Sequence, residues 1–288
     1  MNVKVKLFVS FSGGKSSAYM AKRLVDEWSD YFDFIFIYAN TGQEREETLI
    51  FIKKCAEHWG INIVWIEAVV HHGIKKSSTH RVVTFNTASR DGEPFEELIK
   101  KYGIPNVSFP HCTRELKLRP MNSYLASIGW IKGTYKTAIG IRGDEPARLR
   151  KDAEQVGIIY PLAHLFPVDK IDVNDWWEEQ PFNLQLKDYE GNCSWCWKKS
   201  QAKHFRLIDE VPHIYGFPAR MEQEYPTAGT NPPGAGPRVF FRGNRSTIDL
   251  FTARVEIGPM LPPLIDRPDE NSGCSESCDI NMEIGGDE

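Results

Sequence analysis

The first 70 residues alternate between apolar runs and amphipathic segments, and this alternation restricts the fold more than any other feature of the sequence. Apolar runs at 3–11, 33–40 and 61–66 predict strands, and the segments at 16–28 and 45–59 between them predict helices. The continuous apolar run at 33–40 is typical of a strand buried on both faces of a parallel sheet. The order β-α-β-α-β with short connections predicts an α/β fold with an open, doubly wound, mostly parallel sheet.

The remainder of the chain is less regular. Further helices are predicted at 94–102, 114–127, 172–179 and 199–209, and a further strand at 134–141. From residue 225 the sequence is rich in proline and glycine, and its last stretch is acidic, which is typical of a loop followed by a mobile tail. We therefore expect one globular domain at 1–209 and an irregular C-terminal extension at 210–288.

Charge and hydropathy exclude several classes of protein. The net charge of -4 gives no global basic field for nucleic acid or a membrane surface, although a local basic patch stays open. The apolar run at the N-terminus is too short to span a bilayer and lacks a secretory cleavage pattern. We expect a soluble, cytoplasmic protein in which the six cysteines do not form a disulfide framework.

A glycine-rich loop, SGGKSS, stands between the first predicted strand and the first predicted helix. Its members are Ser12, Gly13, Gly14, Lys15, Ser16 and Ser17. Paired glycines let backbone N–H groups approach an anion, and the helix N-terminus adds unsatisfied donors and the positive end of the helix dipole. The serine hydroxyls add donors and the lysine adds a positive charge. The alternative is a tight turn in which a serine caps the helix. The coincidence of strand, glycines, lysine and helix favours a phosphate-binding site.

Polar residues follow the second predicted strand as well. Asn40, Thr41 and Gly42 lie at the edge of an open α/β sheet where ligands bind. Their side chains can hydrogen-bond a ribose or a base edge, or they can cap the next helix. We favour the ligand contact.

Arg142 lies in a glycine-flanked turn after the strand predicted at 134–141. A guanidinium in such a turn can fork onto phosphate or sulfate oxygens. Asp144 and Glu145 can orient this arginine or a metal ion such as Mg²⁺, and Arg148 can join the same anion-binding surface. The alternative is a solvated charged loop. Lys117 and Arg119 are weaker candidates, which fit an ordinary helix surface.

Cys193 and Cys196 form a CxxC motif, which puts two thiolates within reach of one centre. Together with Cys274 and Cys278 they have an acceptable ligand spacing for Zn²⁺, and such a site would tie down the tail. A redox dithiol is another interpretation, because a CxxC motif lowers thiol pKa values. Inert, reduced thiols are the last alternative.

Together these segments resemble a known family. SFSGGKSSAYM is similar to the pyrophosphate-binding loop, usually SGGxDS, of the adenine-nucleotide alpha-hydrolase superfamily. Within that superfamily the chain resembles the phosphoadenosine phosphosulfate reductase family over about residues 5–205, through four further segments in the family's order. They are Tyr38–Glu44 with Glu46–Thr48, His111–Lys117 with Pro120, Gly140–Glu145 with Arg148, and Gly191–Cys196. The chain departs from the family at Ser16, where an aspartate is usual, and at His111, where a cysteine is usual. The C-terminal Glu-Cys-Gly motif of the reductases is not evident.

The resemblance implies a site for ATP or an adenylyl sulfate. It assigns nucleotide binding to Ser12, Gly13, Gly14, Lys15, Ser16, Ser17, Asn40, Thr41, Gly42, Gly140, Arg142 and Arg148. It assigns catalysis to Lys15, Ser17, Arg142 and Cys112. Cys112 would join Cys193 and Cys196 around a [4Fe-4S] cluster, leaving one iron for His111, another ligand or a sulfur substrate.

These features favour an enzyme of sulfur chemistry that forms an adenylate from ATP and releases pyrophosphate. Sulfur from the Cys112, Cys193 and Cys196 centre would then displace AMP. One alternative is a sulfonucleotide reductase, in which Cys274 or Cys278 attacks a sulfonate and releases sulfite. A second alternative is a non-catalytic nucleotide-binding regulator. The expected partners are a sulfur donor or thiol reductant protein, and a nucleic-acid acceptor stays open.

Three further groups of residues are expected to be structural. His71, His72 and His80 lack helical spacing, which favours a solvated loop over a metal site. Trp176 and Trp177 are expected to pack near the nucleotide domain. A basic stretch after the CxxC motif fits a solvated helix face, with contact to a phosphate backbone as the alternative; its members are Lys198, Lys199, Lys203, His204 and Arg206.

Overall fold

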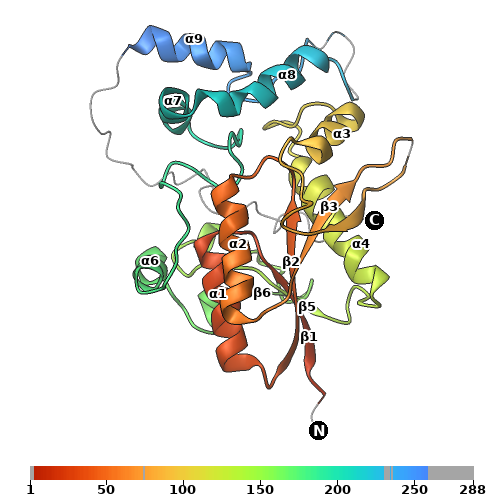
Figure 1. The fold of residues 1–288 in the computed structure, drawn as a ribbon. Helices are drawn as coiled ribbons and strands as arrows, with labels where there is room; N and C mark the ends of the chain where they lie inside the picture. The colour runs from red at the N-terminus through yellow and green to blue at the C-terminus, as the bar shows by residue number, and fades with distance from the viewer. Residues whose placement is uncertain (1–2, 74, 230–233, 235, 259–288) are drawn as a thin grey trace.

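The computed structural model describes residues 3–73, 75–229, 234 and 236–258. These residues form a six-stranded sheet in the order β4-β3-β2-β1-β5-β6, with flanking helices on both faces (Figure 1). The strands are β1 Val5–Ser10, β2 Phe32–Asn40, β3 Ile63–Val69, β4 Thr79–Val83, β5 Lys136–Ala138 and β6 Ile158–Ile159. Every pair is parallel except β3 with β4. This arrangement confirms the predicted doubly wound α/β fold.

β1 lies in the middle of the sheet and sets the position of the ligand crevice. From β1 the chain moves outward to β2 and β3 on one side, and later returns to place β5 and β6 on the other side. The loops that follow β1 and β5 therefore separate at the carboxyl edge. In open α/β sheets, ligands bind in the crevice at such a switch point.

Two hydrophobic clusters cover the two faces of the sheet. On one face Leu7, Val9 and Phe36 pack against α1 Lys15–Trp28, α2 Glu46–Trp59 and α6 Lys170–Glu178. On the other face the alternate residues Phe8 and Ile37 pack against α4 Arg119–Ser127. Successive side chains of a strand point to opposite faces, so the continuous apolar runs supply both clusters.

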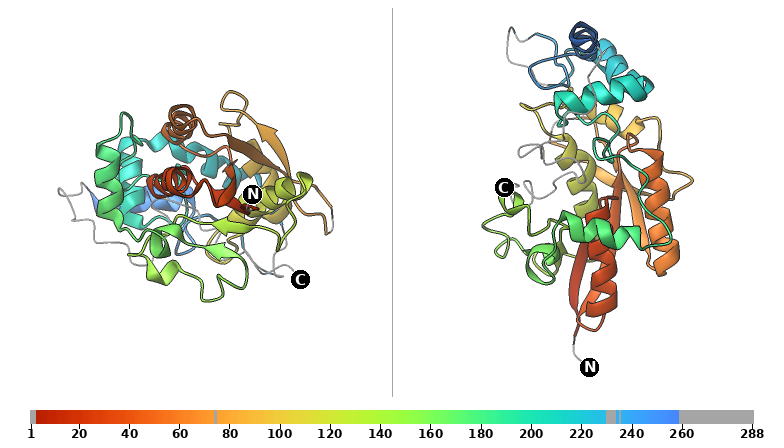
Figure 2. Two further views of the ribbon diagram at one scale, coloured as in Figure 1. Left: turned by 90° about the horizontal axis from the view of Figure 1, so that it is seen from below. Right: turned by 90° about the vertical axis from the view of Figure 1, so that its left-hand side faces the viewer.

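A third cluster lies beyond the carboxyl ends of the strands. It joins α3 Glu93–Tyr102 to three later helices, which we call the helical cap: α7 Gln201–Glu210, α8 Gly216–Glu224 and α9 Thr247–Ile257. The right-hand view of Figure 2 places the cap at the opposite end of the molecule from the N-terminus. The cluster draws side chains from both sides of the predicted boundary at 209/210, and that boundary stays a prediction.

The remaining short elements connect these layers. They are the π-helix η1 Arg114–Leu118, the 3-10 helices η2 Pro146–Arg148 and η3 Pro212–Tyr215, and the short helix α5 Pro161–His164. The helix predicted at 114–127 is thus a π-helix that continues into α4. The strand predicted at 134–141 pairs only over Lys136–Ala138.

The sequence did not predict β4, β6, α8 or α9. β4 is an edge strand with a mixed, partly exposed sequence, and β6 has two residues, so neither has a clear period. α8 begins with Gly216 and contains Pro218, which are poor helix formers. The acidic tail, with Cys274 and Cys278, lies outside the described residues.

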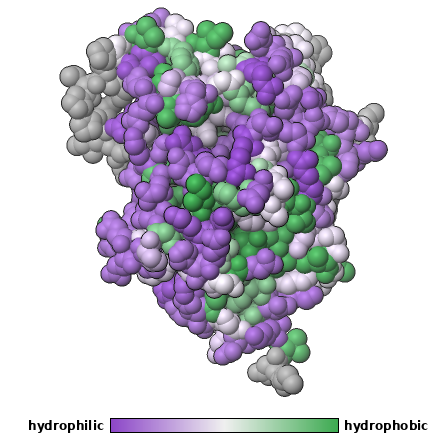
Figure 3. All heavy atoms as spheres, viewed as in Figure 1, coloured by the Kyte–Doolittle hydropathy of each residue, from purple (hydrophilic) through white to green (hydrophobic). Residues whose placement is uncertain are grey.

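The surface seen in Figure 3 is mostly polar, with apolar side chains gathered beside α2 over β2 and β3. No helix within the described ranges is both long enough and apolar enough to cross a membrane.

Candidate functional site

Helix α1 begins directly after the glycine-rich loop, and its N-terminus is not capped by a side chain of any described residue. Gly14 occupies the N-cap position in an extended conformation, and the first turn contains no acidic residue. By contrast, Asp169 and Ser246 cap α6 and α9 with capping boxes. The alternative interpretation, in which a serine side chain caps the helix, is therefore wrong for α1. Its first N–H groups and its dipole face the crevice, as in anion-binding sites.

The shape of the loop depends on Gly13 and on two serines. Gly13 has φ +84°, and a Cβ at this position would lie 2.7 Å from Thr48 Cγ2. Ser12 Oγ donates to Ser17 Oγ at 2.9 Å, and Ser17 Oγ donates to the carbonyl of Gly14 at 3.0 Å. Both hydroxyl protons are thus used inside the loop, so these serines fix its shape.

Helix α6 supports the first turn of α1 from outside the sheet. The indole N–H of Trp177, a fully buried residue, donates to the carbonyl of Lys15 at 3.1 Å. Lys15 Nζ lies 3.5 Å from Asn174 Oδ1. Trp177 also packs against Trp176 and Phe51. The expectation that Trp176 and Trp177 pack against the predicted nucleotide domain is confirmed.

Arg142 comes to the loop from the far side of β1. Its Nη1 donates to Ser16 Oγ at 2.8 Å, and the residue is 6% exposed. Gly140 makes this approach possible, because a Cβ there would lie 3.0 Å from Ser17 Cα. The loops after β1 and β5 therefore bring a buried arginine to the N-terminus of α1, whose first residue is Lys15.

Acidic residues of the loop after β5 hold Arg142 and Arg148. Asp144 accepts from Arg142 Nε at 2.9 Å, and Glu145 accepts from the Arg142 backbone N–H at 3.2 Å. Glu145 also pairs with Arg148. An incoming anion would compete with these carboxylates for the guanidinium groups.

Asn40 and Thr41, at the end of β2, each contact a different buried carboxylate. Asn40 is fully buried, and its Nδ2 donates to Glu67 Oε1 at 2.7 Å. Thr41 uses both its backbone N–H and its hydroxyl on Glu44, at 2.8 and 2.9 Å. Thr41 is therefore turned toward the interior, while Gly42 continues the turn with φ +79°.

The segment that carries the CxxC motif lies against both nucleotide loops. Asn192 Nδ2 donates to the carbonyl of Ser12 at 2.8 Å, and the carbonyl of Asn192 accepts from Arg45 N at 2.8 Å. Cys193 pairs with Glu44 in an antiparallel bridge. Asn192 was not singled out from the sequence, although it lies within the family-like segment Gly191–Cys196.

Lys117 faces the interior and lies close to Glu44. Its side chain is 12% exposed, and Nζ lies 3.6 Å from Glu44 Oε1, so it faces inward rather than lying on an ordinary helix surface. The wide turn of η1 places Lys117 and the fully buried Glu115 on inward-facing positions. π-helical turns are often found at functional sites.

The predicted metal ligands do not form a metal site within the part of the chain that is described. No three His, Cys, Asp or Glu side chains there are grouped closely enough to hold an ion. Cys112, Cys193 and Cys196 form no disulfides; Cys196 is buried and the other two are half-buried. His111 Nε2 contacts the carbonyl of Gly103 at 3.0 Å, and burial lowers the pKa of this histidine to about 4. Among the described residues, Cys112, Cys193, Cys196 and His111 are thus not grouped as ligands of one [4Fe-4S] cluster, and the predicted zinc quartet includes Cys274 and Cys278, which lie outside the described residues.

The residues expected to be structural fall into two groups. His71 and His72 lie in the loop before β4 and contact Thr79 and Glu97. The expectation of a solvated loop is wrong for His80, which lies in strand β4 and contacts Ser123 Oγ at 2.9 Å. The expectation of a solvated basic face is wrong for Lys199 and His204, which are buried. Lys199 Nζ donates to the carbonyl of Cys193 at 2.7 Å, and His204 Nδ1 contacts the Tyr215 hydroxyl at 2.7 Å.

Comparisons with known proteins agree with this geometry. The family model described as the phosphoadenosine phosphosulfate reductase domain matches residues 6–178. An uncharacterized nin region protein of Escherichia phage lambda is 35% identical over 198 residues, which are 68% of this chain and 67% of the relative. Two uncharacterized proteins of Methanocaldococcus jannaschii are each 28% identical, over 222 and 123 residues. These matches cover 74% and 43% of this chain, but only 47% and 20% of the two relatives. The chain therefore belongs to the phosphoadenosine phosphosulfate reductase domain family.

Proposed function

We propose that the chain is an enzyme that binds ATP in the crevice between the loops after β1 and β5, and forms AMP and pyrophosphate in a sulfur-transfer reaction. The observation that carries this proposal is the meeting of Arg142 with the uncapped N-terminus of α1 at Ser16. A helix N-terminus, a lysine and a buried arginine around one crevice suit a polyphosphate better than a neutral ligand.

The proposed reaction has two steps. An oxygen of the acceptor attacks the α-phosphorus of ATP, the bond to the bridging oxygen breaks, and pyrophosphate leaves on the glycine-rich loop. A nucleophilic sulfur then attacks the adenylated carbon of the acceptor, and AMP leaves with the acceptor oxygen. The residues assigned to catalysis act by position and charge: Lys15 and Arg142 neutralise the phosphates, and Ser17 holds the loop in shape.

The cysteines would serve the second step. Asn192 holds the CxxC segment against the loop, which supports a role for Cys193 and Cys196 close to the nucleotide. We place Cys112 in the same sulfur centre because of its position in the family-like segment His111–Lys117. A metal–sulfur cluster would supply an iron that binds sulfide, but the described residues are not grouped as its ligands.

Membership of a family described as a reductase domain favours a second candidate function. In this reaction a cysteine thiolate attacks the sulfonate sulfur of an adenylyl sulfate, and the nucleotide leaves as the phosphate. A second thiol then attacks the thiosulfonate and releases sulfite, and the two cysteines become a disulfide. The nucleophile would be Cys274 or Cys278, which lie outside the described residues.

One experiment separates these candidates. The anaerobically purified chain is incubated with ATP, a sulfide donor and total RNA as the source of the acceptor oxygen, or with an adenylyl sulfate and a thiol reductant. Pyrophosphate release from ATP that falls at least tenfold in Arg142→Gln but not in Lys22→Gln supports the first proposal, because Lys22 pairs with Asp26 away from the crevice. Sulfite release supports the reductase. Tight ATP binding without turnover in either assay contradicts both and leaves a regulatory nucleotide-binding protein.

A further inference from the structure

The amide group of Asn40 can lie in only one orientation. Its Nδ2 donates one proton to Glu67 Oε1 at 2.7 Å and the other to the carbonyl of Ser89 at 2.9 Å. Both neighbours offer oxygen atoms as acceptors, so turning the amide over would place Oδ1 against two oxygens. The contacts therefore fix which side of the amide carries the acceptor.

The acceptor on that side is unused. Oδ1 of Asn40 is buried and receives no hydrogen bond from any described residue. A buried acceptor without a donor is unfavourable, and in native proteins it usually has a reason. Asn40 lies three residues beyond Ile37, the register partner of Ser10, which places it beside the glycine-rich loop at the carboxyl edge. An unused acceptor at this edge is therefore suited to accept a hydrogen bond from a ligand.

Glu67 is held as firmly as the asparagine that it orients. Its side chain is fully buried at the end of β3, beside β2. Oε1 also accepts from the backbone N–H of Ser89 at 2.6 Å, and Oε2 accepts from Arg81 Nε at 2.9 Å. Both oxygens of Glu67 thus accept hydrogen bonds from N–H groups, and Oε1 is the acceptor that faces Asn40.

We infer that Glu67 is a positioning residue that presents Oδ1 of Asn40 to a hydrogen-bond donor on the nucleoside half of the ligand. The donor is a ribose hydroxyl or the exocyclic amino group of the base, since these are the donors that an adenine nucleoside carries. Because Oδ1 is buried, this contact requires the side chains around it to shift when the nucleotide binds. This inference rests on the proposed function, because it requires an adenine nucleotide in the crevice.

The test compares dissociation constants for ATP and for three analogues that each lack one donor: 2′-deoxy-ATP, 3′-deoxy-ATP and the triphosphate of purine riboside. The full-length wild-type chain is expected to bind one analogue at least tenfold more weakly than ATP, and that analogue identifies the donor. In Asn40→Ala the difference should fall below threefold. The difference in affinity between ATP and that analogue should also shrink in Glu67→Gln. The glutamine amide can donate a hydrogen bond to Asn40 Oδ1, so the Asn40 amide is no longer held in one orientation.

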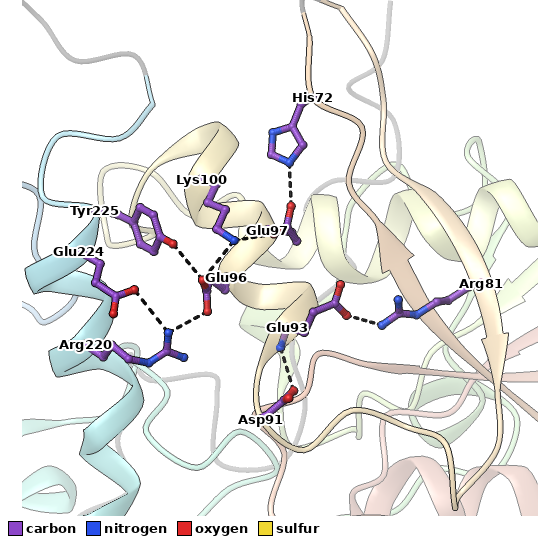
Figure 4. Close-up of polar contacts among 10 residues, drawn as sticks. All are labelled: His72, Arg81, Asp91, Glu93, Glu96, Glu97, Lys100, Arg220, Glu224 and Tyr225. Atoms are coloured by element: carbon purple, nitrogen blue, oxygen red, sulfur yellow. Dashed lines mark hydrogen bonds and ion pairs between the residues drawn. The ribbon is translucent and has the colours of Figure 1, made fainter.

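Glu93→Gln is the matched control. Glu93 pairs with the same Arg81 (Figure 4), whereas Asn40 donates to Glu67 and Ser89, so this variant should keep the wild-type preference. Circular dichroism and thermal melting check that each variant is folded, and Glu67→Asp serves as a second, milder variant that retains a carboxylate and should retain the preference. Equal affinity of the wild type for all four nucleotides, or an undiminished preference in Asn40→Ala, would overturn the inference while ATP binding itself stands. Absence of binding to any of the four contradicts the proposed function, and this inference with it.

Discussion

Arg142 donates a hydrogen bond from Nη1 to the hydroxyl of Ser16 at 2.8 Å, and the two residues are 126 positions apart in the sequence. The contact joins the loops after β1 and β5 across the crevice. Where the family's loop usually carries an aspartate, Ser16 offers a neutral oxygen. The charge of Arg142 is balanced instead by Asp144 and Glu145 on its own loop.

Ser16→Asp should weaken nucleotide binding. A carboxylate at this position would pair with Arg142 at close range and add negative charge beside the phosphates, so we expect the affinity for ATP to fall about tenfold, equivalent to about 1.4 kcal/mol. Ser16→Ala should change it less than threefold, because Arg142 keeps Asp144. Isothermal titration with ATP measures both. Tighter binding in Ser16→Asp would contradict this prediction. It would mean that a carboxylate at position 16 helps to hold the nucleotide as a ligand for a bound cation.

The fold was predictable because its sheet and inner helices are built from strongly periodic segments. The runs at 33–40 and 61–66 became β2 and β3, and the helices predicted at 16–28 and 45–59 agree with α1 and α2 to within one residue at each end. These elements bury one face or both, so their hydrophobic pattern is determined by the architecture itself. The edge strand β4 and the cap helices α8 and α9 lack such a pattern.

The candidate site was only partly predictable, because tertiary contacts decide which polar atoms face the crevice. The glycine-rich loop and Arg142 have a local signature, and the structure brings them together. The contacts of Asn192 with Ser12 and of Lys117 with Glu44 join distant segments, and no local spacing indicates them. Thr41 and Ser17 matched a motif, yet their hydroxyl protons are used inside the protein.

Asn192→Ala should loosen the CxxC segment. The side chain donates to the carbonyl of Ser12 and lies 3.3 Å from Thr48 Oγ1, and both contacts are lost in this variant. We expect faster alkylation of Cys193 by iodoacetamide, by about threefold to tenfold, and weaker binding of ATP. Mass spectrometry of the labelled peptide measures the rate at one fixed pH.

Gln185→Ala is the control for this experiment, since Gln185 is an exposed amide whose bond is to the carbonyl of Asn183 only. It should leave the alkylation rate of Cys193 unchanged. An unchanged rate in Asn192→Ala as well would mean that the antiparallel bridge between Glu44 and Cys193 holds the segment without the side chain.

Arg220→Ala should weaken the attachment of the helical cap to α3. Glu96 accepts from Arg220 Nη1 and from the Tyr225 hydroxyl, each at 2.9 Å (Figure 4). Burial disfavours the charged carboxylate of Glu96, but these hydrogen bonds outweigh burial and lower its pKa. The free energy of unfolding should fall by about 0.5–1 kcal/mol, and less at high salt, because the pair is partly exposed.

Urea denaturation at two salt concentrations checks this prediction. Lys22→Ala removes an ion pair with Asp26 within one helix and should cost less, because no second element is released. An equal cost in both variants would show that the contact between α3 and α8 adds nothing beyond a surface pair.

The stability of the chain should fall as the pH is lowered from 6.5 toward 4, because two histidines are buried in neutral form. Burial lowers the pKa of His111 to about 4 and that of His204 to about 3. Both values lie below the value of about 6.5 for an unfolded histidine, so in this window the unfolded chain binds more protons and is favoured. At pH 5.5 each histidine should reduce the free energy of unfolding by about 1.4 kcal/mol relative to pH 8.

His111→Gln keeps a donor for the carbonyl of Gly103 but does not titrate, so the slope of stability against pH between 5 and 6.5 should fall by about half. His213→Gln, at an exposed histidine, should leave the slope unchanged. Denaturant unfolding at a series of pH values measures all three slopes, and a wild-type slope of zero in this window would mean that neither histidine is held neutral by burial.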